Sequence, residues 1–226
     1  MNADILNNIA WHSLSGPHLE HSVGSNHAKR YAMGFSPIAG FLDPLNPDLN
    51  ALKPFCQAGE HLYISNWQGP CPPGWAVIAD TSAYLMTWIG GKVELMTNEK
   101  MRILNSRDLP QVLKLAELAK LDPFGPKALE LGLYFGIFEM GQLVAMGGER
   151  MFAQGLREIG SVATHPEYRH QGYARTIMGA LIAEHQKNHE LSFLHVMRDN
   201  EHAHHIYERM GFQLFKEIPV RVVAPA

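Results

Sequence analysis

The pattern of apolar and polar positions changes near residue 92 and predicts two parts of different character. In the first part the periodicity is weak. A helix is expected over residues 3–13 and another from Asn46 to Cys56, with Asn46 as its cap and Pro47 in its first turn. Extended runs follow at residues 61–65, 75–80 and 83–89. The pair Gly90-Gly91 predicts a boundary, so we expect a small α/β domain over residues 1–91 and a second domain over 92–226.

In the second part the periodicity is clear and predicts a mixed α/β fold. Helices are expected at residues 109–120 (capped by Asp108), 127–131, 173–187 and 201–210, the last capped by Asn200 and ended by Gly211. Strands are expected at residues 93–96, 101–104, 133–138, 143–152, 156–164, 193–197 and 212–223. Residues 122–126, rich in proline and glycine, separate the first two of these helices.

Composition excludes several classes of protein. Among 226 residues, 19 are Lys or Arg and 22 are Asp or Glu, so the net charge of −3 argues against broad affinity for nucleic acid or anionic membranes. The two cysteines, Cys56 and Cys71, form no CxxC pair, which argues against a disulfide scaffold or a zinc ribbon. No apolar run reaches the roughly 20 residues that span a bilayer. We therefore expect a cytoplasmic protein with no membrane or nucleic-acid partner.

The strongest candidate site lies where the strand at 156–164 runs through a short loop into the helix at 173–187. The first turn of a helix leaves backbone N–H groups unpaired, and the helix dipole makes that end attractive to anions. Gly172 and Ala174 keep the backbone accessible, and Arg169 and Arg175 add positive charge. The alternative is an ordinary strand–helix junction with a solvated basic loop, and the spacing alone does not decide between them.

A second element follows at the expected distance. Asn200 begins a helix, Ala203 and Tyr207 lie close to one face of it, and Gly211-Phe212 closes it. Together the two elements resemble the GNAT superfamily of acyl-CoA-dependent N-acetyltransferases. The run Arg169-His170-Gln171-Gly172-Tyr173-Ala174 is similar to the Arg/Gln-x-x-Gly-x-Gly/Ala pyrophosphate loop of that family, and the resemblance covers residues 93–226.

A narrower resemblance is to a group of bacterial predicted acetyltransferases. The matching segments are Asp122-Pro123-Phe124-Gly125-Pro126 (with Asp in place of the group's Gly), Gly148-Glu149-Arg150-Met151, Thr164-His165-Pro166 and Trp11-His12-Ser13-Leu14-Ser15-Gly16-Pro17-His18. The last of these implies that the first part belongs to the same architecture, either as a smaller α/β domain or as a degenerate copy of the fold.

The resemblance implies acetyl transfer from acetyl-CoA to a primary amine by direct attack, with acetyl-CoA as co-substrate. The implied residues of the acetyl-CoA site are Val162, Ala163, Thr164, Arg169, His170, Gln171, Gly172, Tyr173, Ala174, Arg175, Asn200 and Ala203. Tyr207 would donate a proton or a hydrogen bond to the departing sulfur. Outside this motif Tyr207 would be read as a core aromatic and Asn200 as a helix cap.

The proton acceptor is open between two carboxylates. Glu158 precedes Gly172 by fourteen positions, where histone acetyltransferases of the superfamily carry their base, and Glu149 lies on the preceding strand. Each has a simpler interpretation as a strand surface residue. A well-placed base contributes roughly 10²- to 10⁴-fold to the rate.

Several further questions stay open or have a negative answer. The acceptor amine belongs either to a small molecule or to a protein, and the chain is expected to be a monomer or a homodimer. We expect no metal site, because no carboxylate or cysteine is seen to complete the histidines near residue 204. The alternative function is that of a non-catalytic protein that binds acyl-CoA.

Overall fold

The computed structural model describes residues 3–90, 99–121 and 124–226. The α-helices are α1 (Ala3–Asn7), α2 (Ile9–Leu14), α3 (Leu109–Leu118), α4 (Tyr173–Lys187) and α5 (Glu201–Arg209). The strands are β1 (Ser22–Gly24), β2 (Ala28–Tyr31), β3 (Ala39–Phe41), β4 (Leu62–Ser65), β5 (Trp75–Trp88), β6 (Met101–Ile103), β7 (Tyr134–Glu139), β8 (Gln142–Ala153), β9 (Leu156–Thr164), β10 (Leu191–Met197) and β11 (Phe212–Pro225). Short 3₁₀ turns lie at Leu19–His21, Leu49–Phe55, Ser106–Asp108, Ala128–Leu131 and Pro166–Tyr168.

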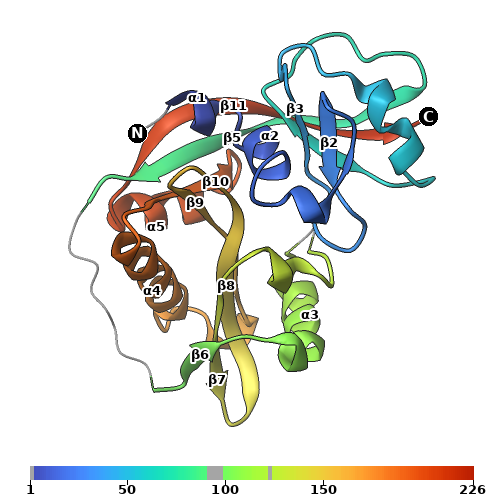
Figure 1. Ribbon diagram of the computed structural model, residues 1–226. Coiled ribbons are helices and arrows are strands. Elements are labelled where there is room, and N and C mark those ends of the chain that lie inside the picture. Colours follow the sequence, from blue (N-terminus) through green and yellow to red (C-terminus); the bar gives the residue numbers. More distant parts are fainter. Residues whose placement is uncertain (1–2, 91–98, 122–123) are drawn as a thin grey trace.

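The large sheet has eight strands in the order β4-β11-β5-β10-β9-β8-β7-β6, and a separate small sheet has the order β1-β2-β3. Each adjacent pair in the large sheet is antiparallel except β9 with β10, which is parallel. The fold is therefore mixed α/β, as the sequence predicts. Figure 1 shows α4 and α5 on one side of this sheet and α3 on the other.

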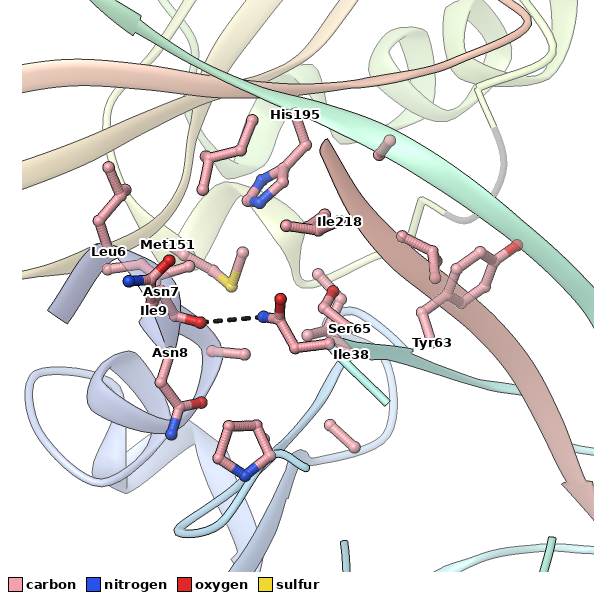
Figure 2. Close-up of a pocket in the computed structure, with 18 of the residues that line it drawn as sticks. Leu6, Asn7, Asn8, Ile9, Ile38, Tyr63, Ser65, Met151, His195 and Ile218 are labelled. Atoms are coloured by element: carbon pink, nitrogen blue, oxygen red, sulfur yellow. Dashed lines mark hydrogen bonds between the residues drawn. The ribbon is translucent and has the colours of Figure 1, made fainter. Parts of the chain in front are cut away.

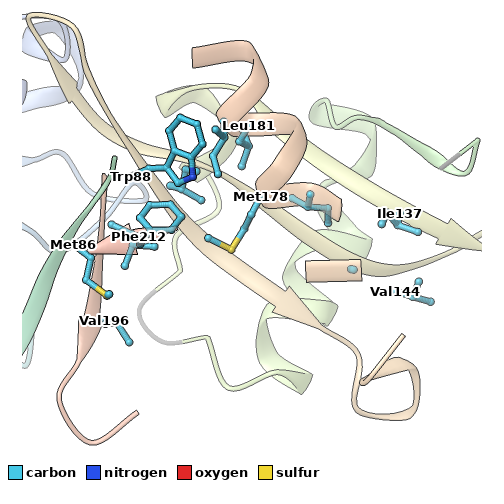
Figure 3. Close-up of a cluster of buried hydrophobic side chains, with 13 residues drawn as sticks. Met86, Trp88, Ile137, Val144, Met178, Leu181, Val196 and Phe212 are labelled. Carbon is cyan, nitrogen blue, oxygen red and sulfur yellow. The ribbon is translucent and has the colours of Figure 1, made fainter. Parts of the chain in front are cut away.

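Apolar clusters on both faces of the sheet hold these layers together. On one face, α4 packs its buried stripe, including Ile177, Met178 and Leu181, against Met86 and Val196 of the sheet (Figure 3). On the other face, α1, α2 and α3 pack in two further clusters, with Leu85 and Phe193 in the first and Tyr134 and Met146 in the second. Burying both faces of the central strands in this way explains why β8 and β10 carry runs of apolar residues rather than a strict alternation.

The two predicted parts of the chain share one sheet. The strand β5 lies between β10 and β11, and β4 pairs with β11 from the far side. The division at residue 91 stays a prediction, and Gly91 itself, with the strand expected at 93–96, lies outside the described residues. Strand pairing does continue from one part into the other.

Several local predictions differ from the structure. The helix expected at 3–13 is divided into α1 and α2, and the one expected at 127–131 is a 3₁₀ turn. The runs at 75–80 and 83–89 form one strand, β5, because β11 pairs with it along its whole length. The segment 49–55 is a 3₁₀ turn capped by Asp48, whose carboxylate accepts from the Ala51 amide at 3.2 Å, and Asn46 does not cap it. The side chain of Asp108 does not cap α3 but accepts from the Asn105 amide and from Arg102.

No helix in the described ranges is long and apolar enough to cross a membrane.

Candidate active site

The beginning of α4 has the geometry of an anion site. Gly172, the N-cap residue, has φ of +81°, and His170 two residues earlier has φ of +65°. The first intrahelical bond runs from the Thr176 amide to the Gly172 carbonyl at 3.0 Å, so the preceding amides lie outside the helix's own bonding. A Cβ on Gly172 would meet no atom within 4 Å. Glycine is therefore needed here for its left-handed backbone and not for lack of space.

The side chains around this turn leave it open and positively charged. Arg169, His170, Gln171 and Arg175 are exposed, and Ala174 is half-buried. The Tyr173 hydroxyl donates to Glu139 at 2.6 Å and so fixes the helix start to β7. The arrangement presents backbone amides, a positive helix end and two guanidinium groups to solvent, which together suit a phosphate group.

Beside this turn the parallel strands β9 and β10 separate. Their pairing joins residues 191–193 to residues 156–158 and is not recorded further along, although β9 continues to Thr164 and β10 to Met197. A bulge in β9 lies between Gly160 and Ala163, and Ser161 there has φ of +55°. Beyond Glu158, the amides along this edge of β9 therefore have no strand partner on the β10 side within the part of the chain that the structure describes.

The three β9 residues predicted for the acetyl-CoA site border this opening through their backbone. The Val162 side chain packs against the α4 core, and that of Ala163 packs against the α3 core. Thr164 pairs with Ala145 of β8 on the other edge. Their side chains therefore hold the strand in place, which leaves the main chain to face the gap.

The helix α5 follows β10 and packs on the same side of the sheet as α4. Asn200 caps it, accepting from the Ala203 amide at 3.2 Å, and Ala203 packs against the α4 core. Tyr207 is half-buried, with its ring 6.1 Å from that of Phe212. Burial raises the pKa of Tyr207 while the charge of Arg150 on β8 opposes the rise, so the phenol stays protonated at neutral pH.

Glu158 is not placed to act as a base. Its side chain is fully buried, forms an ion pair with Arg150 and accepts from Nδ1 of His195 at 2.7 Å. Burial alone would raise its pKa, but the Arg150 charge and His195 lower the pKa of Glu158 to about 2. A carboxylate with so low a pKa is a weak base, and both of its oxygens already accept hydrogen bonds, which argues against the expectation that Glu158 takes a proton directly from an amine.

Glu149 is likewise held by other groups. It accepts from Nε2 of His185, from the Leu133 amide and from Arg157, each at 3.1 Å. Burial raises its pKa, and these three donors outweigh burial and lower it. The expected second base candidate therefore joins α4 to the sheet and is not free for proton transfer.

His195 is the residue that the sequence analysis missed. An ionised Glu158 only accepts hydrogen bonds, so Nδ1 of His195 carries a proton, and Nε2 of the neutral imidazole is left as an acceptor. No hydrogen bond to Nε2 is recorded in the described part of the chain. Figure 2 shows the His195 ring bordering a cavity of about 300 Å³, with Met151 and Ile218 nearby. A polar side chain inside the apolar strand 193–197 was the one available signal.

The histidines near residue 204 do have a carboxylate beside them, contrary to what was expected from the sequence. His204, His205 and Glu208 of α5 place one ligand atom each within 4.8 Å of one another. A carboxylate does therefore lie beside these histidines, because Glu208 is three and four residues further along the same helix. The absence of a metal site stays a prediction.

Comparisons with known proteins agree with this geometry. The sequence profile of the Acetyltransferase (GNAT) family matches residues 100–212. A Novosphingobium aromaticivorans protein described as belonging to the GNAT acetyltransferases has a TM-score of 0.88 and 26% identity, with 98% of each chain covered.

Two further solved structures are similar in fold. A GCN5-related N-acetyltransferase from Kribbella flavida has a TM-score of 0.60 and 17% identity, covering 98% of this chain and 96% of that chain. A GCN5-related N-acetyltransferase-like protein from Streptococcus suis has a TM-score of 0.58 and 16% identity, covering 97% and 99%. No curated protein matches the chain significantly.

Proposed function

The chain belongs to the Acetyltransferase (GNAT) family, and on that premise we propose that it transfers an acetyl group from acetyl-CoA to a primary amine by direct attack in a ternary complex. The observation that carries the proposal is that the pairing of β9 and β10 covers only residues 156–158 and 191–193, while the anion site of α4 follows the end of β9 and His195 follows on β10. Acetyl-CoA supplies an activated acyl group and a thiolate leaving group.

The donor would bind through the loop and the separated strands. In this proposal the amides and guanidinium groups of residues 169–175 hold the pyrophosphate, and the pantetheine arm enters between β9 and β10. The amides of Val162–Thr164 would then stabilise negative charge on the thioester oxygen, as oxyanion-hole donors do. Support comes from the unpaired β10-facing edge of β9 and the left-handed backbone at Gly172.

The amine must lose a proton to attack, since an alkyl ammonium has an ordinary pKa of about 10. We assign the proton to Nε2 of His195, with Glu158 as a positioning residue that fixes the imidazole tautomer from the buried side. The 2.7 Å hydrogen bond between His195 and Glu158 supports this assignment. Arg150 keeps Glu158 ionised and thereby keeps the tautomer constant.

Tyr207 would stabilise the departing sulfur. A simple thiol has a pKa of about 8.5, and the pKa of Tyr207 is raised above the ordinary phenol value. Full proton transfer from the phenol to the thiolate would therefore be uphill, so we assign Tyr207 the role of hydrogen-bond donor to the leaving group.

The test measures release of free thiol from acetyl-CoA with a panel of amines and identifies the acetylated product by mass. The Tyr207→Phe variant should lower kcat by about 10²-fold, the usual loss for a donor to developing negative charge, with the Kd for acetyl-CoA unchanged. Tyr84→Phe is the matched control, since Tyr84 packs against the same core and has no assigned role.

An unchanged kcat in Tyr207→Phe would show that the leaving group is stabilised elsewhere. If wild-type protein binds acetyl-CoA but acetylates no amine, the second candidate, a non-catalytic acyl-CoA-binding protein, replaces this one. The specific observation in its favour is that both expected carboxylate bases, Glu149 and Glu158, are held in ion pairs.

A further inference from the structure

The cavity beside His195 is built jointly by the two parts of the chain. One wall is the segment Leu6–Ala10 of α1 and α2. The rest comes from β3, β4, β5, β8, β10 and β11 and from loop residues, namely Ser36, Ile38, Pro44 and Asn66. Its volume of about 300 Å³ is at the lower end of the range for small-molecule sites. Figure 2 shows Asn7, Ile9, Ile38 and Ile218 around the space that His195 borders.

Two residues that line this cavity carry a hydrogen-bond acceptor with no partner among the described residues. These acceptors are Oδ1 of Asn66 and Oδ1 of Asn7, and both atoms are buried. The orientation of the Asn66 amide is fixed, because its Nδ2 donates to the backbone oxygen of Asn7 at 2.9 Å (dashed in Figure 2). Leaving a buried acceptor unsatisfied is costly, and either a water molecule or a donor group on a bound ligand can supply the missing hydrogen bond.

The charged side chains of the cavity restrict the class of ligand that can bind there. Among residues 3–90, 99–121 and 124–226, no aspartate, glutamate or lysine lines it, and the one guanidinium, that of Arg150, forms an ion pair with buried Glu158. Most of the lining residues are apolar, including Ile9, Ile38 and Ile218. A ligand with several positive charges would find no carboxylate in the cavity to balance them. A ligand that carries a carboxylate would add another hydrogen-bond acceptor beside the two asparagine oxygens, which themselves need donors.

We propose that this cavity binds the acceptor substrate, and that the substrate is a small, mainly apolar amine whose second polar group is an uncharged hydrogen-bond donor held by Asn7 and Asn66. The proposal rests on the function proposed above, since it places the amine within reach of His195. The aliphatic wall holds the body of the substrate, and the two amide oxygens select the donor group.

The experiment is calorimetric binding of three matched ligands to the wild-type protein. Leucinamide carries an amine, an aliphatic body and an uncharged N–H donor; leucine methyl ester lacks the donor, and leucine carries a carboxylate instead. Leucinamide should bind at least about tenfold more tightly than either, the effect of one or two neutral hydrogen bonds. Equal binding of the ester, or tightest binding of leucine, would overturn the proposal.

Two variants test whether the asparagines cause the preference for leucinamide over leucine methyl ester. Asn7→Leu removes one free oxygen with little change of size, and Asn66→Gly removes the other while keeping a backbone whose φ is +67°. Each should lower the preference for leucinamide over the ester at least threefold. Retention of the full preference in both folded variants would contradict the assignment.

Two further outcomes separate this inference from the proposed function. The tripeptide Leu-Ala-Ala-amide keeps a donor at the same place, and tighter binding of it than of leucinamide would replace the small-molecule acceptor by a polypeptide amino terminus. Binding is measured without acetyl-CoA. If the protein prefers leucinamide but transfers no acetyl group, only the proposed function is contradicted. If it acetylates amines but does not prefer leucinamide, only this inference is contradicted.

Discussion

At the scale of single residues, the contacts of Glu158 decide how the site can work. The sequence places a carboxylate fourteen positions before Gly172 and so predicts a base. Its partners come from elsewhere, Arg150 from β8 and His195 from β10, 37 residues further along. Those contacts depend on strand order, which spacing along the chain does not give. In the proposed mechanism, the role of proton acceptor therefore passes from the buried carboxylate of Glu158 to the imidazole of His195, which lines the cavity.

Substitution of His195 tests that step. The variant His195→Gln should lower kcat/KM for the amine by about 10²- to 10⁴-fold and leave the Kd for acetyl-CoA unchanged. The measurement is kcat/KM for the amine together with the Kd for acetyl-CoA, with the exposed His61→Gln as control. A kcat/KM in His195→Gln equal to that of the wild type would assign the proton acceptor elsewhere.

At the scale of elements, the later part of the chain was predictable because its periodicity is local. The helix α4 has the predicted bounds, and α5 and β9 differ from prediction by at most one residue. The anion loop and the cap at Asn200 also follow from nearby residues. The cavity could not be predicted, since Leu6–Ala10 meets β8 and β10 more than 130 residues away.

The earlier part was predicted less well because long-range pairing shapes its elements. Nothing local indicates that 75–88 is one strand, since that continuity comes from pairing with β11. The segment ending in His18 was taken from a resemblance, and the structure gives it a structural role. His18 is buried and bonds to Ser13, to the Tyr31 hydroxyl and to the Leu131 carbonyl.

At the scale of the whole molecule, such contacts join the two parts of the chain. His18 bonds across to Leu131, at 2.9 Å, and the Lys127 amide donates to the Gly34 carbonyl at 2.7 Å. A Cβ on Gly125 would lie 2.1 Å from the Phe35 carbonyl, so this glycine lets the two parts approach closely. The proposed acceptor cavity is lined by residues from both parts of the chain. The contacts that join the two parts are therefore expected to maintain the cavity as well.

The junction should weaken in acid. Burial lowers the pKa of His18 from 6.5 to about 4, so the unfolded chain binds a proton at His18 that the folded chain resists. Stability from this group is therefore complete above pH 6.5 and falls as the pH drops toward 4. Between pH 7 and pH 4.5 the loss should be about 2 kcal/mol, from 1.36 kcal/mol per pKa unit.

Urea unfolding at the two pH values measures this loss, with His18→Gln as the comparison. The variant should be less stable at pH 7 because it disturbs the bonds to Tyr31 and Leu131, but its stability should change less with pH. Glu158 does not confound the comparison, because its lowered pKa places its loss of stability below pH 4.5. An identical pH dependence in the wild type and His18→Gln would contradict the account.

The most direct test of the central claim is calorimetric binding of acetyl-CoA to the wild type and to two matched glycine variants. Gly172 and Gly141 have φ of +81° and +82°, and a Cβ on either meets nothing within 4 Å, so Gly172→Glu and Gly141→Glu should cost similar folding free energy. Gly141 lies in the turn between β7 and β8 and supplies no amide to the first turn of α4.

The account predicts that acetyl-CoA binds the wild type and Gly141→Glu alike and binds Gly172→Glu at least about thirtyfold more weakly, corresponding to about 2 kcal/mol. Equal binding to all three proteins, or no binding to the wild type, would mean that the beginning of α4 is not the donor site.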